Sequence, residues 1–311
     1  MMRGTVLALT LLAAPAAMAA DAVTRLAVVA PPAAQPPAGA GALGAGGLRL
    51  GDGLAAALWD DGLAEVAEYD LQQFRYGALH PGSATLIVVR EDLDPLRAVK
   101  AAGDVGETVP VLKVHLVTSY QTGVYRYEQA ATTFLRRADA VPLRLFIGSH
   151  EWCGTAAKSW INRGDGSRMD VISYFDGHGD LQQDLTLPSD ALLADGLVVA
   201  LRAWLAMPRA PERIQFVPSQ VEARTVSTAA LPASLARAAV LVAPTWAGAG
   251  GEPLPGTAVM LTTARGEERF VFAAAAPHAL WSWRGGDGST LTLRRLRRFA
   301  YWAQHDPADR P

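Results

Sequence analysis

Residues 109–127, VPVLKVHLVTSYQTGVYRY, point to the fold class. The β-branched, apolar run Val109–Val117 predicts a strand, Gln121–Gly123 a turn, and Gly123–Tyr127 a second strand. Further strands are predicted over 65–76, 84–90, 142–147, 169–175, 213–217, 239–242, 256–262, 268–273 and 289–293. Strands that follow one another without intervening helical periods favour an antiparallel meander over alternating strand–helix–strand units.

One segment has helical character. Pro188-Ser189-Asp190 opens it with Ser189 as a suitable N-cap, and apolar residues then recur at helical spacing until Pro208. Such a helix needs an apolar surface to cover, which the face of a sheet supplies. The predicted fold class is mainly β, or α+β: a strongly curved antiparallel sheet or half-barrel covered by one main helix. The Ala- and Ser-rich residues 224–237 predict a loop or short helix.

The first residues have the pattern of an export signal. Arg3 precedes an apolar core over 6–14, and Ala17-Met18-Ala19 fits the small-x-small cleavage site, so residues 1–19 are predicted to be a cleavable signal peptide. The one cysteine of the chain, Cys153, lies far from this segment, so no lipidation cysteine follows it. We therefore expect a periplasmic or secreted protein.

Composition divides the rest of the chain. The Ala-, Pro- and Gly-rich residues 20–50 predict a flexible leader, because they cannot bury enough apolar surface to offset the entropy of ordering. Residues 51–311 are predicted to be a single β-rich domain. A division into two domains near Pro208 is the alternative.

Overall composition excludes several classes of protein. Half of the 311 residues are apolar and 19% are charged, unlike a disordered chain or a coiled coil. The formal net charge of −2 lacks the excess of Lys and Arg that nucleic-acid binding requires. No later apolar stretch has the roughly 20 residues of a membrane-spanning helix. Walker A, G-x-S-x-G, H-E-x-x-H and paired C-x-x-C motifs are absent from the sequence, and no cofactor is predicted.

The sequence SHEWCG holds the densest group of reactive side chains. Cys153 is a candidate nucleophile, with His150 and Glu151 beside it and His115 or His178 as other bases. If the preceding strand continues, Glu151 and Cys153 share one face and His150 points away. One alternative is a small, buried cysteine at the end of a strand. Another is redox chemistry or a disulfide to a second chain.

The sequence DGHGD is a candidate metal site. Asp176, His178 and Asp180 could bind a divalent metal if the three side chains converge. The glycines between them equally suit a tight hairpin turn with polar, solvent-facing residues.

A basic run lies near the C-terminus. Arg294, Arg295, Arg297 and Arg298 could bind an anionic ligand, a lipid headgroup or an envelope partner. The alternative is a solvated edge strand or helix face, where charge discourages edge-to-edge pairing.

Aromatic side chains concentrate in the middle third of the chain. Tyr120, Tyr125, Tyr127, Trp152 and Tyr174 would line a pocket for an acyl chain or other amphipathic ligand on the concave side of a curved sheet. Packed inward, the same rings would simply be core.

Residues 65–184 carry phrases that resemble a group of uncharacterised bacterial exported proteins, many of them lipoproteins. The shared phrases are RYG at 75–77, VPVLK at 109–113, TGVY at 122–125, EWCG at 151–154, and SYF at 173–175 followed by Gly177, Gly179 and Asp180. The resemblance implies no activity and no catalytic residues. More loosely, the order of strands, helix and strands resembles the open half-barrels of periplasmic lipoprotein carriers.

These observations predict a non-catalytic exported protein that binds an apolar or amphipathic ligand or serves in envelope maintenance. The first alternative is an exported enzyme with Cys153 as its nucleophile. The second is a structural envelope protein that binds a partner through the Arg294–Arg298 surface.

Overall fold

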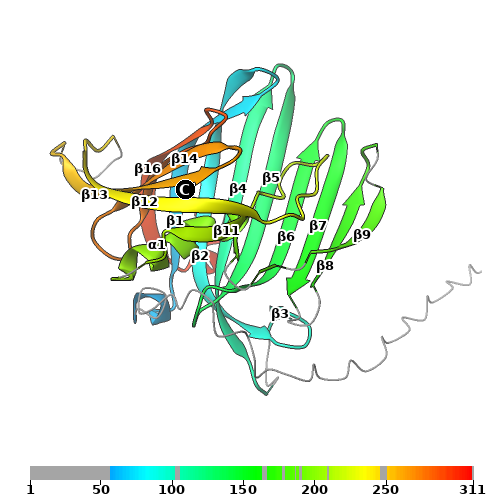
Figure 1. Ribbon diagram of the computed structural model, residues 1–311, viewed down its shortest axis with the longest axis horizontal. Helices are drawn as coiled ribbons and strands as arrows, with labels where there is room; N and C mark the ends of the chain where they lie inside the picture. Colours follow the sequence, from blue (N-terminus) through cyan, green and yellow to red (C-terminus); the bar gives the residue numbers. More distant parts are fainter. Residues whose placement is uncertain are drawn as a thin grey trace, which may run out of the picture. The chain divides into compact units, whose positions relative to one another are not determined.

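The structure, a computed structural model, describes residues 57–101, 106–162, 167–176, 179–185, 187–188, 191–208, 210–245 and 251–309. The predicted signal peptide and leader lie outside these residues. Within them, a 16-stranded sheet runs in the order β10-β11-β12-β13-β14-β15-β16-β1-β2-β4-β5-β6-β7-β8-β9, and the short β3 (Val99–Lys100) pairs with β2. The predicted class, a mainly β fold built on a curved and largely antiparallel sheet, is confirmed (Figure 1).

The N-terminal part of the sheet is an antiparallel meander. Its strands are β1 (Ala64–Arg75), β2 (Ala78–Asp94), β4 (Val109–Thr122), β5 (Tyr125–Arg136), β6 (Pro142–Glu151), β7 (Gly154–Asn162), β8 (Ser167–Ser173) and β9 (Asp180–Asp184). Two-residue turns at 76–77, 123–124 and 152–153 join β1 to β2, β4 to β5 and β6 to β7. Because neighbouring strands alternate in direction, these turns lie at the same end of the sheet.

The C-terminal part returns to the first strand. Its strands are β10 (Ala191–Leu193), β11 (Arg213–Val217), β12 (Leu231–Val242), β13 (Leu254–Thr263), β14 (Gly266–Ala273), β15 (Leu280–Arg284) and β16 (Thr290–Phe299). β16 pairs antiparallel with β1, so the last strand of the sequence lies beside the first. Short 3-10 helices are η1 (Ala57–Asp60), η2 (Ala194–Gly196) and η3 (Tyr301–Ala303).

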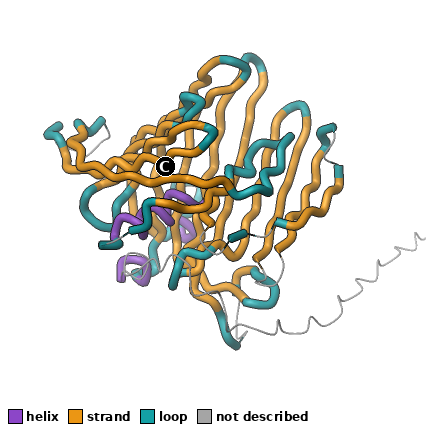
Figure 2. The backbone as a smooth tube through the Cα atoms, in the orientation of Figure 1, coloured by secondary structure: helices purple, strands orange, loops and turns teal. Residues whose placement is uncertain are grey.

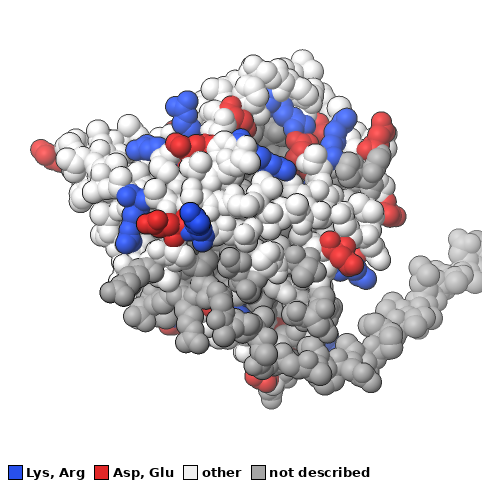
Figure 3. All heavy atoms as spheres, in the orientation of Figure 1, with Lys and Arg blue, Asp and Glu red and all other residues white. Residues whose placement is uncertain are grey.

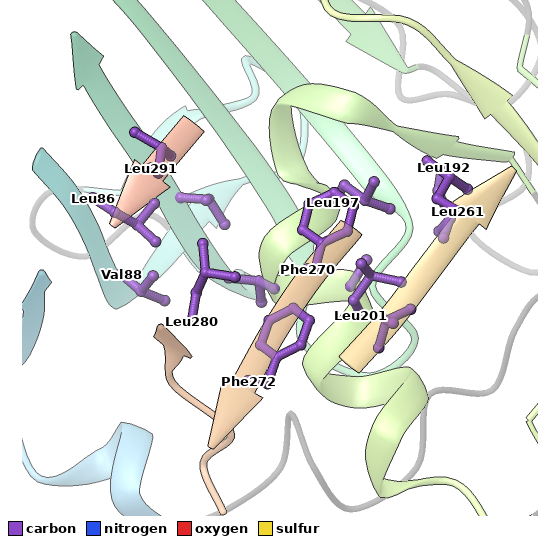
Figure 4. Packing of buried hydrophobic residues seen from close by; sticks show 14 of the residues in the cluster. Leu86, Val88, Leu192, Leu197, Leu201, Leu261, Phe270, Phe272, Leu280 and Leu291 are labelled. Atoms are coloured by element: carbon purple, nitrogen blue, oxygen red, sulfur yellow. The ribbon is translucent and has the colours of Figure 1, made fainter. Parts of the chain in front are cut away.

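The sheet curves around helix α1 (Leu197–Ala206). One hydrophobic cluster joins side chains of α1 to inward-facing residues of β1, β2 and β4 and to residues of β13–β16 (Figure 4). A single helix can contact both parts of a sheet only if the sheet bends around it. The helix is more enclosed than a cover on one face would be, since seven of its ten residues are buried.

The enclosed helix carries a buried charge. Arg202 of α1 and Glu65 of β1 are almost fully buried, and Arg202 Nη1 lies 2.7 Å from Glu65 Oε1. Neither atom has a hydrogen bond of good geometry, so the contact is a charge pair more than an aligned hydrogen bond. It fixes α1 to β1 inside the curve of the sheet.

The predicted start of the helix is wrong. Ala191–Leu193 forms β10, which pairs parallel with Gln215–Val217 of β11, and α1 begins only at Leu197 with Gly196 as its N-cap. Ser189 and Asp190 lie outside the described residues. α1 therefore sits in a crossover between two parallel strands, an arrangement that the predicted meander did not contain. Short apolar runs such as 191–193 fit either a strand or a helix, and only the distant partner β11 decides between them.

A second correction concerns residues 224–237. They were expected to be loop or short helix. Residues 224–230 do lie outside the helices and strands, but β12 begins at Leu231 and pairs with β13 as far as Val242. The pairing partner supplies strand hydrogen bonds that Ala-rich composition alone does not predict.

Candidate functional site

A cavity of about 490 Å³ lies on the concave side of the sheet. Its apolar walls come from β1, β2 and β4, from η2 and α1, and from β11 and β14; they include Leu71, Leu86, Val114, Leu116, Leu197 and Phe270. On β4 the lining residues Val114, Leu116, Thr118 and Tyr120 occupy every second position, which is the strand period that aims them all at one face. The sequence pattern of β4 thus builds one wall.

Polar side chains gather towards one end of the cavity. Gln73 and Arg75 are the last inward-facing residues of β1, and Gln129 faces inward from β5. The Arg75 guanidinium forms an ion pair with the Glu222 carboxylate. It also lies 5.1 Å from the centre of the Tyr127 ring, within cation–π range. A ligand would therefore meet an apolar interior and a polar end.

A group of tyrosines continues this polar end. Tyr120 and Tyr127 stack with ring centres 4.9 Å apart, and Tyr125 tilts against Tyr127 at 5.5 Å. The Tyr76 hydroxyl lies 2.7 Å from the Tyr127 hydroxyl and accepts a hydrogen bond of 3.1 Å from Tyr125. Burial raises the pKa of Tyr120 to about 12, and burial together with the Glu151 carboxylate raises the pKa of Tyr127. Both hydroxyls stay protonated near neutral pH.

Residues 218–228, here called the strap, form most of the connection between β11 and β12 and close one side of the cavity through Pro218, Ser219, Val221 and Glu222. The ammonium group of Lys158 on β7 fastens the strap. It donates hydrogen bonds to the carbonyl oxygens of Gln220, Glu222 and Thr225 at 2.6, 2.6 and 2.5 Å. Lys158 is 2% exposed, so all three of its protons are used inside the protein.

Further contacts hold the strap at its beginning. The Asp195 carboxylate in η2 accepts hydrogen bonds from the Ser219 hydroxyl and from the Gln220 amide at 2.9 Å. Within the strap, the Gln220 side chain donates to the Ser227 carbonyl at 2.7 Å and accepts from the Ser227 amide at 3.1 Å. Burial raises the pKa of Asp195. Burial lowers the pKa of Lys158 to about 8, so the Lys158 ammonium group is still mostly charged at neutral pH when it holds the strap.

The predicted ligand-binding aromatics divide between two places. Tyr120 lines the cavity, and Tyr127 and Tyr125 pack behind it. Trp152 and Tyr174 instead lie on the surface, 74% and 78% exposed, at the β6–β7 turn and after β8. The structure thus brings three of the five predicted aromatics together at the cavity.

The predicted catalytic residues point in different directions. Glu151, the last residue of β6, is buried beside Tyr127, whereas His150 faces outward and its Nδ1 lies 2.7 Å from Thr155 Oγ1. β6 ends before Cys153, which lies exposed in the turn to β7, so the alternative of a small buried cysteine is wrong. His115 is on β4, where its Nδ1 lies 2.7 Å from Thr132 Oγ1.

Two of the three predicted metal ligands, Asp176 and Asp180, are among the described residues. Asp176 follows β8 and Asp180 begins β9, while His178 lies outside the described residues. Among the residues that the structure describes, no three His, Cys, Asp or Glu side chains are grouped as a metal site requires.

The predicted anion-binding arginines are paired with carboxylates. Glu68 lies 3.1, 2.6 and 3.3 Å from Arg294, Arg295 and Arg297, and Asp61 lies 2.8 Å from Arg298. Their strand, β16, pairs with both β15 and β1, so the alternative of an edge strand is wrong. Three guanidinium groups around one carboxylate leave a local excess of positive charge.

No family model matches the chain, and no curated protein sequence matches it. A similar solved structure is the beta-barrel-like protein of the domain of unknown function DUF1849 from Brucella abortus. It is 10% identical, with a TM-score of 0.47, over 76% of this chain and 98% of that chain. No helix among the described residues has the length and hydropathy needed to cross a membrane.

Proposed function

We propose that the protein binds one apolar or amphipathic small molecule in the cavity and acts as a non-catalytic binding protein after export. The observation that carries the proposal is the cavity itself: its volume of about 490 Å³ and its apolar walls suit a single acyl chain or a molecule of similar size. The signal-peptide pattern of residues 1–19 and the resemblance of residues 65–184 to exported proteins support export.

The two ends of the cavity differ in polarity, so each end suits a different part of the ligand. The hydrocarbon part contacts Leu116, Leu197 and Phe270, where water has few polar partners. The polar part lies toward Gln129, Tyr120 and the Arg75–Glu222 pair. Because the charge of Arg75 is already balanced by Glu222, a neutral or singly charged headgroup suits this end better than a multiply charged one.

Filling the cavity is expected to abolish binding. Leu116 faces the cavity from the middle of β4, so in Leu116→Trp the larger ring occupies the space of the ligand. We expect the Kd for a dansyl-labelled fatty acid, measured by fluorescence titration, to rise about tenfold or more. The hydrocarbon chain of the ligand would lose apolar burial, and even part of the burial of an apolar side chain is worth more than about 1 kcal/mol.

The matched control is Val117→Trp. Val117 is the next residue of the same strand but points away from the cavity and is partly exposed, so this variant should bind like wild type. Circular dichroism on both variants checks that the sheet is retained. The proposal fails if wild type does not bind the probe, or if a folded Leu116→Trp binds as tightly as Val117→Trp.

A further inference from the structure

The hairpin turns at one end of the sheet carry large, exposed apolar side chains. Tyr76 is in the β1–β2 turn, Val124 in the β4–β5 turn and Trp152 in the β6–β7 turn, and Tyr174 follows β8 at the same end. Their exposed fractions are 66, 76, 74 and 78%. These four residues are here called the rim. The turns that bear them follow one another along the upper edge of the sheet (Figure 2).

Residues of this kind are unusual at these positions. Two-residue hairpin turns favour Asn, Asp and Gly, because their backbone needs positive φ and their side chains face water. Tyr76 adopts a positive φ of 52° that costs energy for an aromatic residue. The β5–β6 turn at the opposite end is charged instead, with Arg136 paired to Asp139. Local stability therefore does not explain the rim.

Two of the four rim side chains, Tyr76 and Tyr174, are held in place. The Tyr174 amide donates a hydrogen bond of 3.1 Å to the Thr155 carbonyl, which sets its ring against Gly154 next to the Trp152 turn. A Cβ on Gly154 would lie 2.5 Å from Tyr174 Cδ1, so the absence of a side chain there allows the close approach. The Tyr76 hydroxyl is fixed by Tyr125 and Tyr127. Ordered apolar side chains lose little entropy on binding a surface.

The charges that follow Val124 in the rim balance one another. Arg126 and Glu128, which follow Val124 on β5, form an exposed ion pair of 3.3 Å. On the face shown in Figure 3, basic and acidic side chains of the upper part lie near each other and the uppermost atoms are uncharged. Attraction by the rim is thus apolar and not electrostatic.

From this geometry we propose that the rim docks on the surface of a phospholipid bilayer. Tyr and Trp are the side chains that prefer the headgroup level of a membrane, with an apolar ring and a polar tip. The rim is a row of separate protruding tips, which suits a soft bilayer surface better than the matched groove of a protein partner. The cavity also reaches this end of the sheet, since Arg75, Thr118 and Tyr120 line it just before the turns. A docked rim would place the polar end of the cavity next to the headgroups.

Cys153 allows a direct test, because it is the one cysteine of the chain and lies exposed beside Trp152. The full chain is labelled there with the environment-sensitive dye NBD and mixed with vesicles of phosphatidylcholine, or of phosphatidylethanolamine with phosphatidylglycerol. We expect a blue shift and stronger emission with both, changed little by added salt. Unlabelled protein should cosediment with both.

The variant Trp152→Ser/Tyr174→Ser should lose affinity for the vesicles about tenfold or more in the cosedimentation assay. Leu241→Ser on β12 removes a side chain that is 75% exposed outside the rim, and should bind like wild type. Vesicle affinity that the double variant retains would overturn the proposal, as would binding that needs anionic lipid and disappears in salt. If wild type forms dimers that the double variant does not form, and neither protein binds vesicles, the rim would instead be a contact with a second copy of the chain. The double variant should still bind the dansyl-labelled fatty acid like wild type, because its substitutions lie outside the cavity. This measurement distinguishes a failure of vesicle docking from a failure of ligand binding in the cavity.

Discussion

Glu65→Gln is expected to lower the free energy of unfolding by about 3–5 kcal/mol, because it leaves the charge of Arg202 buried without a counter-charge. Both side chains are at most 4% exposed, so water cannot replace the lost partner. The helix that bears Arg202 is enclosed by the sheet and cannot turn the guanidinium outward without leaving the core. Urea denaturation followed by circular dichroism measures the change.

A double replacement distinguishes the charge from the packing. Glu65→Gln/Arg202→Met removes both charges, and because the native pair lacks well-aligned hydrogen bonds, we expect most of the lost stability to return. Arg126→Gln breaks the exposed pair with Glu128 and should cost less than about 1 kcal/mol. If Glu65→Gln cost no more than Arg126→Gln, the pair would not anchor the helix.

Lys158→Met is expected to cost about 3 kcal/mol and to release the strap. The variant leaves three carbonyl groups, that of Gln220 buried, without the charged donor that they share, and each such hydrogen bond is worth about 1.5–3 kcal/mol before the cost of burying the charge is subtracted. Since the strap closes one side of the cavity, the dissociation rate of a bound dansyl fatty acid should rise in stopped-flow measurements. Unchanged unfolding and an unchanged dissociation rate would show that Lys158 does not fasten the strap.

The pH dependence gives this variant a second readout. Burial lowers the pKa of Lys158 from 10.5 in the unfolded chain to about 8 in the folded protein. Between these values the unfolded chain binds the extra proton, so the contribution of Lys158 to stability rises as the pH increases through this window. The difference in unfolding free energy between wild type and Lys158→Met should therefore be larger at pH 10 than at pH 7. The tyrosines are common to both proteins, so their contributions cancel in this difference.

The strands were the part of the fold that local pattern could predict. The segment 109–127 contains two strands and their turn because β-branched residues and a Gly at positive φ specify them locally. The parallel pairing of β10 with β11 was not predictable from local pattern. Helix α1 separates the two strands along the chain, and the apolar residues of β10 also fit the helical pattern.

The site was predictable only in part. Tyr120, Tyr125 and Tyr127 alternate along one hairpin, so their common face follows from the strand period. Lys158 was missed because its acceptors lie 62 to 67 residues further along the chain, in a loop without a recognisable motif. Its place between Ala156 and Trp160 on the inward face of β7 was the available signal. The alternative of a buried Cys153 rested on the general tendency of free cysteine to be buried, which does not hold in the exposed turn that follows Glu151.

Crystals grown with a fatty acid brominated in the middle of its chain would show whether the cavity binds an acyl chain. Diffraction at the bromine absorption edge locates the acyl chain without any assumption about the fold. We expect one anomalous peak inside the curved sheet, between Leu116, Leu197 and Phe270, and none there in Leu116→Trp. Bromine found solely on the outer surface, or side chains filling that space in the unliganded crystal, would contradict this expectation.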